Sequence, residues 1–106
     1  MRALVINLAR SRERMDFQTV QLAGLGIEFE RVEAIDAVAL DTDTYQTKAY
    51  DWERPLRDTE VACSLSHTKA WQIVLESNRP HLVLEDDALL CSKTGTLIQA
   101  LESYHN

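Results

Sequence analysis

The fold is decided by residues 3–33, ALVINLARSRERMDFQTVQLAGLGIEFERVE. Residues 3–8 are apolar apart from Asn7, a pattern typical of a strand that is buried on both faces. A helix is expected next, with Ser11 as its N-cap and a pair of glycines at its end. Residues 27–33 begin with alternating apolar and polar side chains, which indicates a half-buried strand. Because the order is strand, helix, strand, the two strands are expected to be parallel.

The rest of the chain predicts two more helices and one more strand. Residues 34–57 are mostly polar and have no clear period, so a long loop is expected. The pattern then predicts a helix over 58–77, a short buried strand over 81–84 and an amphipathic helix over 94–104. The fold class is therefore α/β, a mostly parallel sheet flanked by helices. The apolar face expected for the helix over 58–77 consists of Val61, Leu65, Trp71, Val74 and Leu75.

Length, composition and charge exclude several classes of protein. The chain has 106 residues, of which 45% are hydrophobic and 26% charged, and this length predicts a single domain over residues 1–106. The formal net charge of −6 argues against nucleic acid as a partner, because phosphate binding needs a basic surface. Cys63 and Cys91 form no CxxC pair and are expected to be free thiols. No apolar run can span a bilayer, so we expect a cytoplasmic protein, and peripheral contact with the inner membrane stays open.

The most informative motif is Glu85-Asp86-Asp87, which directly follows the apolar residues 82–84. Neighbouring carboxylates repel one another, and a divalent cation such as Mg²⁺ or Mn²⁺ removes that repulsion. Along an extended chain Glu85 and Asp87 point one way and Asp86 the other. The motif therefore predicts a metal held by Glu85 and Asp87, with Asp86 bonded to nearby backbone or sugar groups. The alternative is an acidic turn that caps the next helix.

Three other features allow both a functional and a purely structural interpretation. The first fourteen residues hold four arginines and one acid, which indicates either a solvated helix start or an anion site between the first strand and its helix. Residues 41–43 (Asp-Thr-Asp) match a D-x-D string but follow no strand, so we expect no metal there. His67 is either a core or boundary residue or part of a polar cluster with Ser66. Cys63 is expected to be a small buried residue.

Three separated segments resemble one known family in their order and spacing. They are residues 5–14 (VINLARSRER), 60–71 (EVACSLSHTKAW) and 82–88 (LVLEDDA). On this set the chain resembles glycosyltransferase family 25, the lipopolysaccharide or lipooligosaccharide galactosyltransferase-like group. Residues 34–36 also fit the family, although Ala37 stands where a glycine is common. The resemblance covers nearly all of the chain.

The resemblance implies a fold, a reaction and a cofactor. The fold would be GT-A-type and Rossmann-like, and the enzyme would transfer a sugar, usually galactose, from a UDP-sugar to a glycan or lipid-linked saccharide such as lipopolysaccharide. Mn²⁺ or Mg²⁺ would be the cofactor, with Glu85 and Asp87 as its ligands. The residues that the resemblance places at the donor are Asn7, Arg10, Arg14, Asp36, Ser66, His67 and Asp86. No catalytic base is identified.

Family members are commonly longer than this chain, and this shapes the expected role of residues 1–106. They are expected to be the N-terminal, nucleotide-sugar-binding half of a glycosyltransferase, with an incomplete sheet whose exposed edge favours a homo-oligomer. One alternative is a non-catalytic domain that binds a nucleotide-sugar or a metal. A response-regulator-like domain is disfavoured, because Ala9-Arg10 stand where its acidic pair should follow the first strand. If the chain is a purely structural interaction domain, neutralising Asp86 and Asp87 should leave no metal-dependent change in melting temperature.

Overall fold

The computed structural model describes residues 1–50 and 54–105 and has an α/β fold. Its strands form one sheet in the order β2-β1-β3, and both pairings are parallel. The strands cover Arg2–Asn7 (β1), Phe29–Glu33 (β2) and His81–Glu85 (β3). The α/β class with a parallel sheet is thus confirmed. The sheet is open, with β2 and β3 at its two edges within the described residues, and a homo-oligomer stays a prediction.

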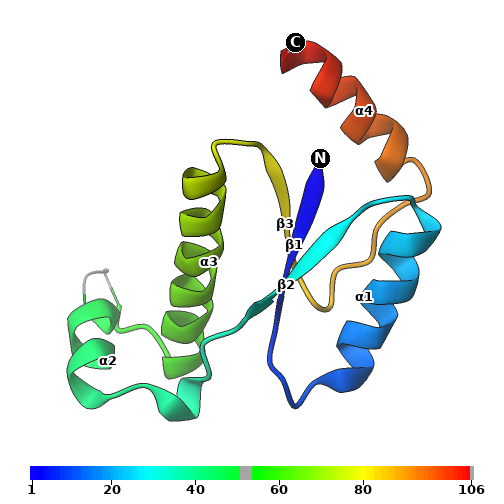
Figure 1. The fold of residues 1–106 in the computed structure, drawn as a ribbon. Coiled ribbons are helices and arrows are strands. Elements are labelled where there is room, and N and C mark those ends of the chain that lie inside the picture. Colours follow the sequence, from blue (N-terminus) through cyan, green and yellow to red (C-terminus); the bar gives the residue numbers. More distant parts are fainter. Residues whose placement is uncertain (51–53, 106) are drawn as a thin grey trace.

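β1 lies in the centre of the sheet because both of its faces are apolar. Residues 3–6 are buried and alternate between two hydrophobic clusters. One cluster includes Leu22 from α1 (Arg12–Gly24), and the other includes Ala70 from α3 (Asp58–Ser77). The two helices therefore cover opposite faces of the sheet (Figure 1).

α3 packs against the sheet through small side chains. Ala62, Ser66 and Ala70 are buried and follow one another at four-residue spacing, which lets the helix approach β1 closely. Trp71 and Leu75, by contrast, are 59% and 77% exposed, so their expected place on the buried face was wrong. Val61 is buried as expected and Val74 packs against the cluster that includes Ala70, so the expected face is right in part. Small residues occupy the rest of the buried face, and the pattern of large apolar residues did not indicate them.

The segment over 34–57, expected to be a loop, contains two short helices. A 3₁₀ helix η1 covers Ala37–Ala39 and α2 covers Thr42–Ala49. The carboxylate of Asp41 caps α2 by accepting hydrogen bonds from the backbone N–H and the hydroxyl of Thr44. The D-x-D string over residues 41–43 is thus the start of a helix, where the sequence predicted a loop. Residues 51–53 lie outside the described residues.

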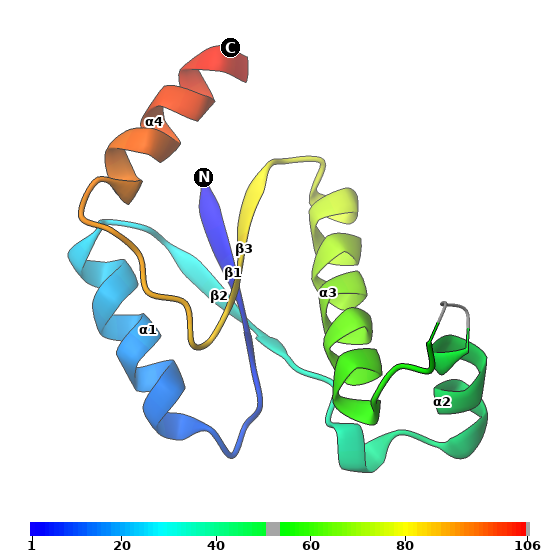
Figure 2. The same cartoon turned by 180° about the vertical axis from the view of Figure 1, so that it is seen from behind.

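α4 (Thr94–His105) completes the fold and lies on the same side of the sheet as α1 (Figure 2). Its Ile98 is buried in the cluster that α1 shares with the sheet. The helices expected over 58–77 and 94–104 are thereby confirmed to within one residue. None of the helices in the described part of the chain is both long and apolar enough to cross a membrane.

Candidate functional site

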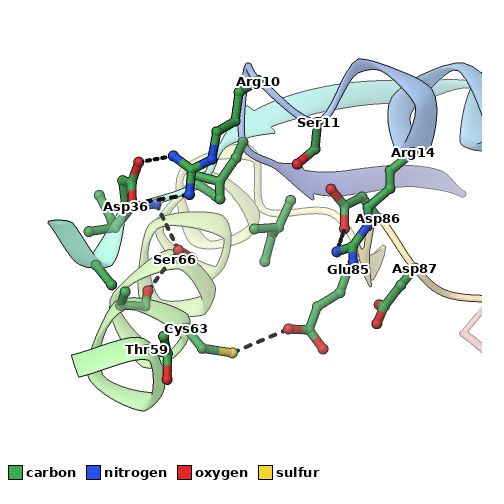
Figure 3. A pocket seen from close by; sticks show the side chains of 16 residues that line it. Arg10, Ser11, Arg14, Asp36, Thr59, Cys63, Ser66, Glu85, Asp86 and Asp87 are labelled. Carbon is green, nitrogen blue, oxygen red and sulfur yellow. Dashed lines mark hydrogen bonds and ion pairs between the residues drawn. The ribbon is translucent and has the colours of Figure 1, made fainter. Parts of the chain in front are cut away.

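A pocket of about 240 Å³ lies at the carboxyl edge of the sheet (Figure 3). Its walls come from the loop between β1 and α1, the segment after β2, the first half of α3 and the residues after β3. This is the edge at which open α/β sheets bind ligands, because the loops there leave a crevice. The polar residues that line it are Arg10, Ser11, Arg14, Asp36, Thr59, Cys63, Ser66, Glu85, Asp86 and Asp87.

Asp86 is the anchor of the acidic motif and is only 9% exposed. Its Oδ2 accepts a hydrogen bond of 2.7 Å from Asn7 Nδ2, and its Oδ1 lies 3.3 Å from a guanidinium nitrogen of Arg14. Its backbone carbonyl accepts a further bond of 3.0 Å from Gln18 Nε2. These contacts compensate the burial of a carboxylate and hold the turn after β3 in place.

Glu85 and Asp87 are exposed on either side of the buried Asp86, and both line the pocket. Asp86 is thus buried between two exposed carboxylates (Figure 3), but residues 86 and 87 form a turn, closed by the bond from the Ala88 N–H to the Glu85 carbonyl, and not the extended chain that was expected. Within the described residues neither carboxylate pairs with a lysine or an arginine. Two such oxygen donors suit a hard divalent cation, so the side chains present fit the Mn²⁺ or Mg²⁺ that the sequence suggested.

Asn7 connects the end of β1 to its surroundings and is 2% exposed. Besides Asp86, its Nδ2 donates to the backbone carbonyl of Ser11 at 3.0 Å, and its Oδ1 accepts from Arg31 Nε at 2.8 Å. Its amide is thus fully bonded inside the protein and positions Asp86. Ser11 is at the N-cap position of α1, but its hydroxyl makes no capping bond, contrary to the expectation. That hydroxyl faces the pocket instead.

Two arginines line the pocket: Arg14 lies against Asp86 of the acidic motif, and Arg10 lies beside Asp36. Arg10 makes an ion pair with Asp36, and this contact lowers the pKa of the Asp36 carboxyl. The same carboxyl caps η1 by accepting from the N–H of Val38 at 3.2 Å. The side chains of Arg10 and Arg14 are more than half exposed and lie where the first strand meets its helix, as the anion-site interpretation requires.

Ser66 and His67 have different surroundings. The Ser66 hydroxyl is buried, donates to the carbonyl of Ala62 at 2.7 Å and accepts from the N–H of Ile35 at 2.8 Å, so it joins α3 to the segment after β2. His67 does not line the pocket, and its Nε2 lies 3.9 Å from Glu85 Oε1. Both residues were expected near the nucleotide-sugar. Ser66 has a structural role, because its hydroxyl joins α3 to the segment after β2, whereas His67 lies next to Glu85 outside the pocket.

Cys63 was expected to be buried, but its side chain is exposed at the pocket. The neighbouring Ala62 faces the sheet and is buried, whereas Cys63 lies beside that face of α3 and stays exposed despite its small size. Its Sγ lies 3.2 Å from Glu85 Oε1. Partial burial and the neighbouring Glu85 carboxylate raise the pKa of the Cys63 thiol.

Gln18 and Arg31 support the site and were not expected from the sequence. Gln18 is fully buried and donates to the carbonyls of Asp86 and Ala88. Arg31 donates to both the side chain and the backbone carbonyl of Asn7. The position of Gln18 offered a signal, since it stands between Met15 and Leu22 in the apolar stripe of α1, where a polar side chain needs a buried partner.

Comparison with known proteins places these features in a family. The family model for glycosyltransferase family 25 (LPS biosynthesis protein) matches residues 1–106. The chain belongs to this family. It is also similar to procollagen galactosyltransferase 2 from mouse and from human, with 37% identity in each case over an alignment of 95 residues that covers 78% of this chain. These aligned residues are 15% of each relative, so this family 25 chain matches a small part of their length.

Proposed function

We propose that this chain provides the nucleotide-sugar site of a family 25 glycosyltransferase, which moves a sugar from a UDP-sugar to a glycan or lipid-linked acceptor. The observation that carries the proposal is the anchored Asp86, because its buried contacts hold Glu85 and Asp87 at a pocket that Arg10 and Arg14 also line. Membership of the family and similarity to two galactosyltransferases support this reaction class and a galactose donor.

The acidic residues and the arginines of the pocket suit the divalent cation and the diphosphate of a nucleoside diphosphate complex. Glu85 and Asp87 would hold the divalent cation, which when bound neutralises charge on the diphosphate as the nucleoside diphosphate leaves. Arg10 and Arg14 have guanidinium donors that can form charge-assisted hydrogen bonds with phosphate oxygens. The hydroxyl of Ser11, which makes no capping bond to α1, adds a neutral hydrogen-bond donor to the pocket.

Metal-dependent nucleotide binding tests the proposal. With Mn²⁺ and UDP at about 100 times their dissociation constants, stabilisation of about 2.7 kcal/mol is expected. For a chain of this size that corresponds to a rise in melting temperature of roughly 10–20 °C. Asp87→Asn should lose most of this rise, because it removes a ligand charge while keeping the shape of the side chain. Asp43→Asn, the same change at an exposed aspartate of α2, should keep all of it.

Two results would contradict the donor site. One is a wild-type melting temperature that Mn²⁺ and UDP leave unchanged, and the other is an equal rise in Asp87→Asn. A second assay measures the release of UDP from UDP-galactose with and without a glycan acceptor. It distinguishes a transferase from a domain that only binds the nucleotide-sugar. Release that depends on acceptor supports the transferase, whereas binding without release supports a non-catalytic nucleotide-sugar domain.

A further inference from the structure

Three side chains with metal-binding atoms meet on the α3 side of the pocket. Cys63 and His67 are four residues apart on α3 and therefore lie on the same face of the helix. Glu85 at the end of β3 faces them. The thiol sulfur, an imidazole nitrogen and a carboxylate oxygen all lie within 4.8 Å of one another. The proposed donor site uses neither Cys63 nor His67.

The separations are close to those of a four-coordinate zinc site. Bonds of about 2.0–2.3 Å in a tetrahedron place ligand atoms roughly 3.3–3.8 Å apart. Cys63 Sγ lies 3.2 Å from Glu85 Oε1, and His67 Nε2 lies 3.9 Å from the same oxygen. The thiol sulfur and the imidazole nitrogen lie within 4.8 Å of each other, so a cation bound among the three atoms requires some side-chain movement. Three protein ligands leave the fourth position open, and Cys63 and Glu85 present it to the pocket.

The elements that carry these ligands are held firmly. Ala62 and Ser66, next to the two ligands on α3, are buried against the sheet or its following segment. The ring of Trp71 lies one turn further along, with its centroid 6.0 Å from that of His67. The cluster is therefore formed by two fixed elements.

The kinds of atoms present select among cations. A thiolate and an imidazole are softer ligands than carboxylates and suit Zn²⁺, whereas Mn²⁺ and Mg²⁺ prefer oxygen. The surroundings are also negative, because the carboxylates of Glu85 and Asp87 line the same pocket as Cys63. When a cation binds, the thiol proton passes to solvent as the metal–sulfur bond forms.

We propose that Cys63, His67 and Glu85 form a site for Zn²⁺ that shares only Glu85 with the Glu85–Asp87 site for a hard cation. The proposal does not depend on glycosyl transfer, because it rests on the side chains of α3 and β3 alone. It also assigns His67 a role as a zinc ligand.

Cobalt spectroscopy of the 106-residue chain tests this site. Co²⁺ added to the reduced protein should produce a thiolate-to-cobalt charge-transfer absorption, and Zn²⁺ should displace it. Cys63→Ser should abolish the absorption, while Cys91→Ser, the same change at the other exposed cysteine, should keep it. His67→Gln should weaken Zn²⁺ binding at least about tenfold in a competition titration. Circular dichroism is recorded for each variant to show that it is folded.

The asparagine variant of the hard-cation site separates this proposal from the proposed function. Asp87→Asn should keep the cobalt absorption even where it loses the response to Mn²⁺ and UDP. The zinc site is refuted by a folded wild type without the absorption, by absorption that survives Cys63→Ser, or by Zn²⁺ affinity that is equal in His67→Gln. Loss of the absorption in Asp87→Asn would equally overturn the assignment of ligands.

Discussion

Replacing Gln18 by leucine tests how the turn that carries the acidic motif is held. In the wild type Gln18 Nε2 donates to the carbonyl of Asp86 at 3.0 Å and to that of Ala88 at 2.7 Å. Ala88 keeps a second donor, Gln21 Nε2 at 3.1 Å, whereas no other donor to the Asp86 carbonyl is found in the described residues. Leucine is similar in size to glutamine but has no donor. The variant therefore leaves one carbonyl unsatisfied in a buried place and weakens a second. It also removes Gln18 Oε1, which accepts from Gln21 Nε2 at 2.8 Å, but Gln21 keeps its bond to Ala88, so the two bonds to carbonyls dominate.

The size of the effect follows from these two bonds. An orphaned buried carbonyl costs about 1–3 kcal/mol and the loss of one further hydrogen bond about 1 kcal/mol, so a loss of about 2–4 kcal/mol is expected. In thermal unfolding this is a fall of roughly 10–20 °C, a large part of the stability of a domain of this size. Denaturant unfolding should show a lower midpoint at an unchanged slope.

Gln72→Leu is the matched control, because Gln72 is exposed in the middle of α3 and experiences the same change of helix propensity. Its unfolding midpoint should stay within about 0.5 kcal/mol of the wild type. If Gln18→Leu is as stable as Gln72→Leu, then the bonds from Gln18 do not hold the turn, and the account of how Asp86 is anchored fails.

Two further predictions concern other parts of the fold. Arg10→Ala should raise the pKa of Asp36 toward its ordinary value of 3.8, as followed by NMR titration. Because the ion pair lowers this pKa, the stability that the pair contributes is present above pH 3.8 and is lost as the pH falls through the folded pKa. An unchanged titration of Asp36 would refute the ion pair. Gly26→Ala should destabilise the fold by about 1 kcal/mol, because Gly26 has a φ of +70°. Gly24→Ala in α1 has open space for its Cβ and should stabilise the fold by about 0.5–1 kcal/mol. Unfolding midpoints that move in the same direction in both variants would contradict this.

The strand–helix–strand opening and the acidic motif were predictable because their signals are local. Continuous apolar residues predict the buried β1 and the short strand before the acidic motif. Residues 86 and 87 form a turn, so period-two geometry does not explain why Asp86 is buried between Glu85 and Asp87. The placement of the motif at the carboxyl edge then follows from the parallel order of the strands. These features carry most of the candidate site.

The remaining features depend on contacts between distant residues, which no local pattern contains. The buried face of α3 is set by how closely the helix approaches β1, so small residues fill it and Trp71 is left outside. The approach of Cys63 to Glu85 spans two elements and needs the packing of α3. α2 escaped prediction because its start is a capping bond at Asp41, while its sequence has no hydrophobic period.

The central position of β1 has a consequence for the order of folding. Ala3 pairs with Phe29, 26 positions later, and with Leu82, 79 positions later. Closing the threefold longer loop costs about 1 kcal/mol more in chain entropy. We therefore expect β1, α1 and β2 to associate first and β3 to join afterwards. Asp86 meets Asn7 only at that last step, so the acidic motif acquires its geometry when the whole sheet is complete.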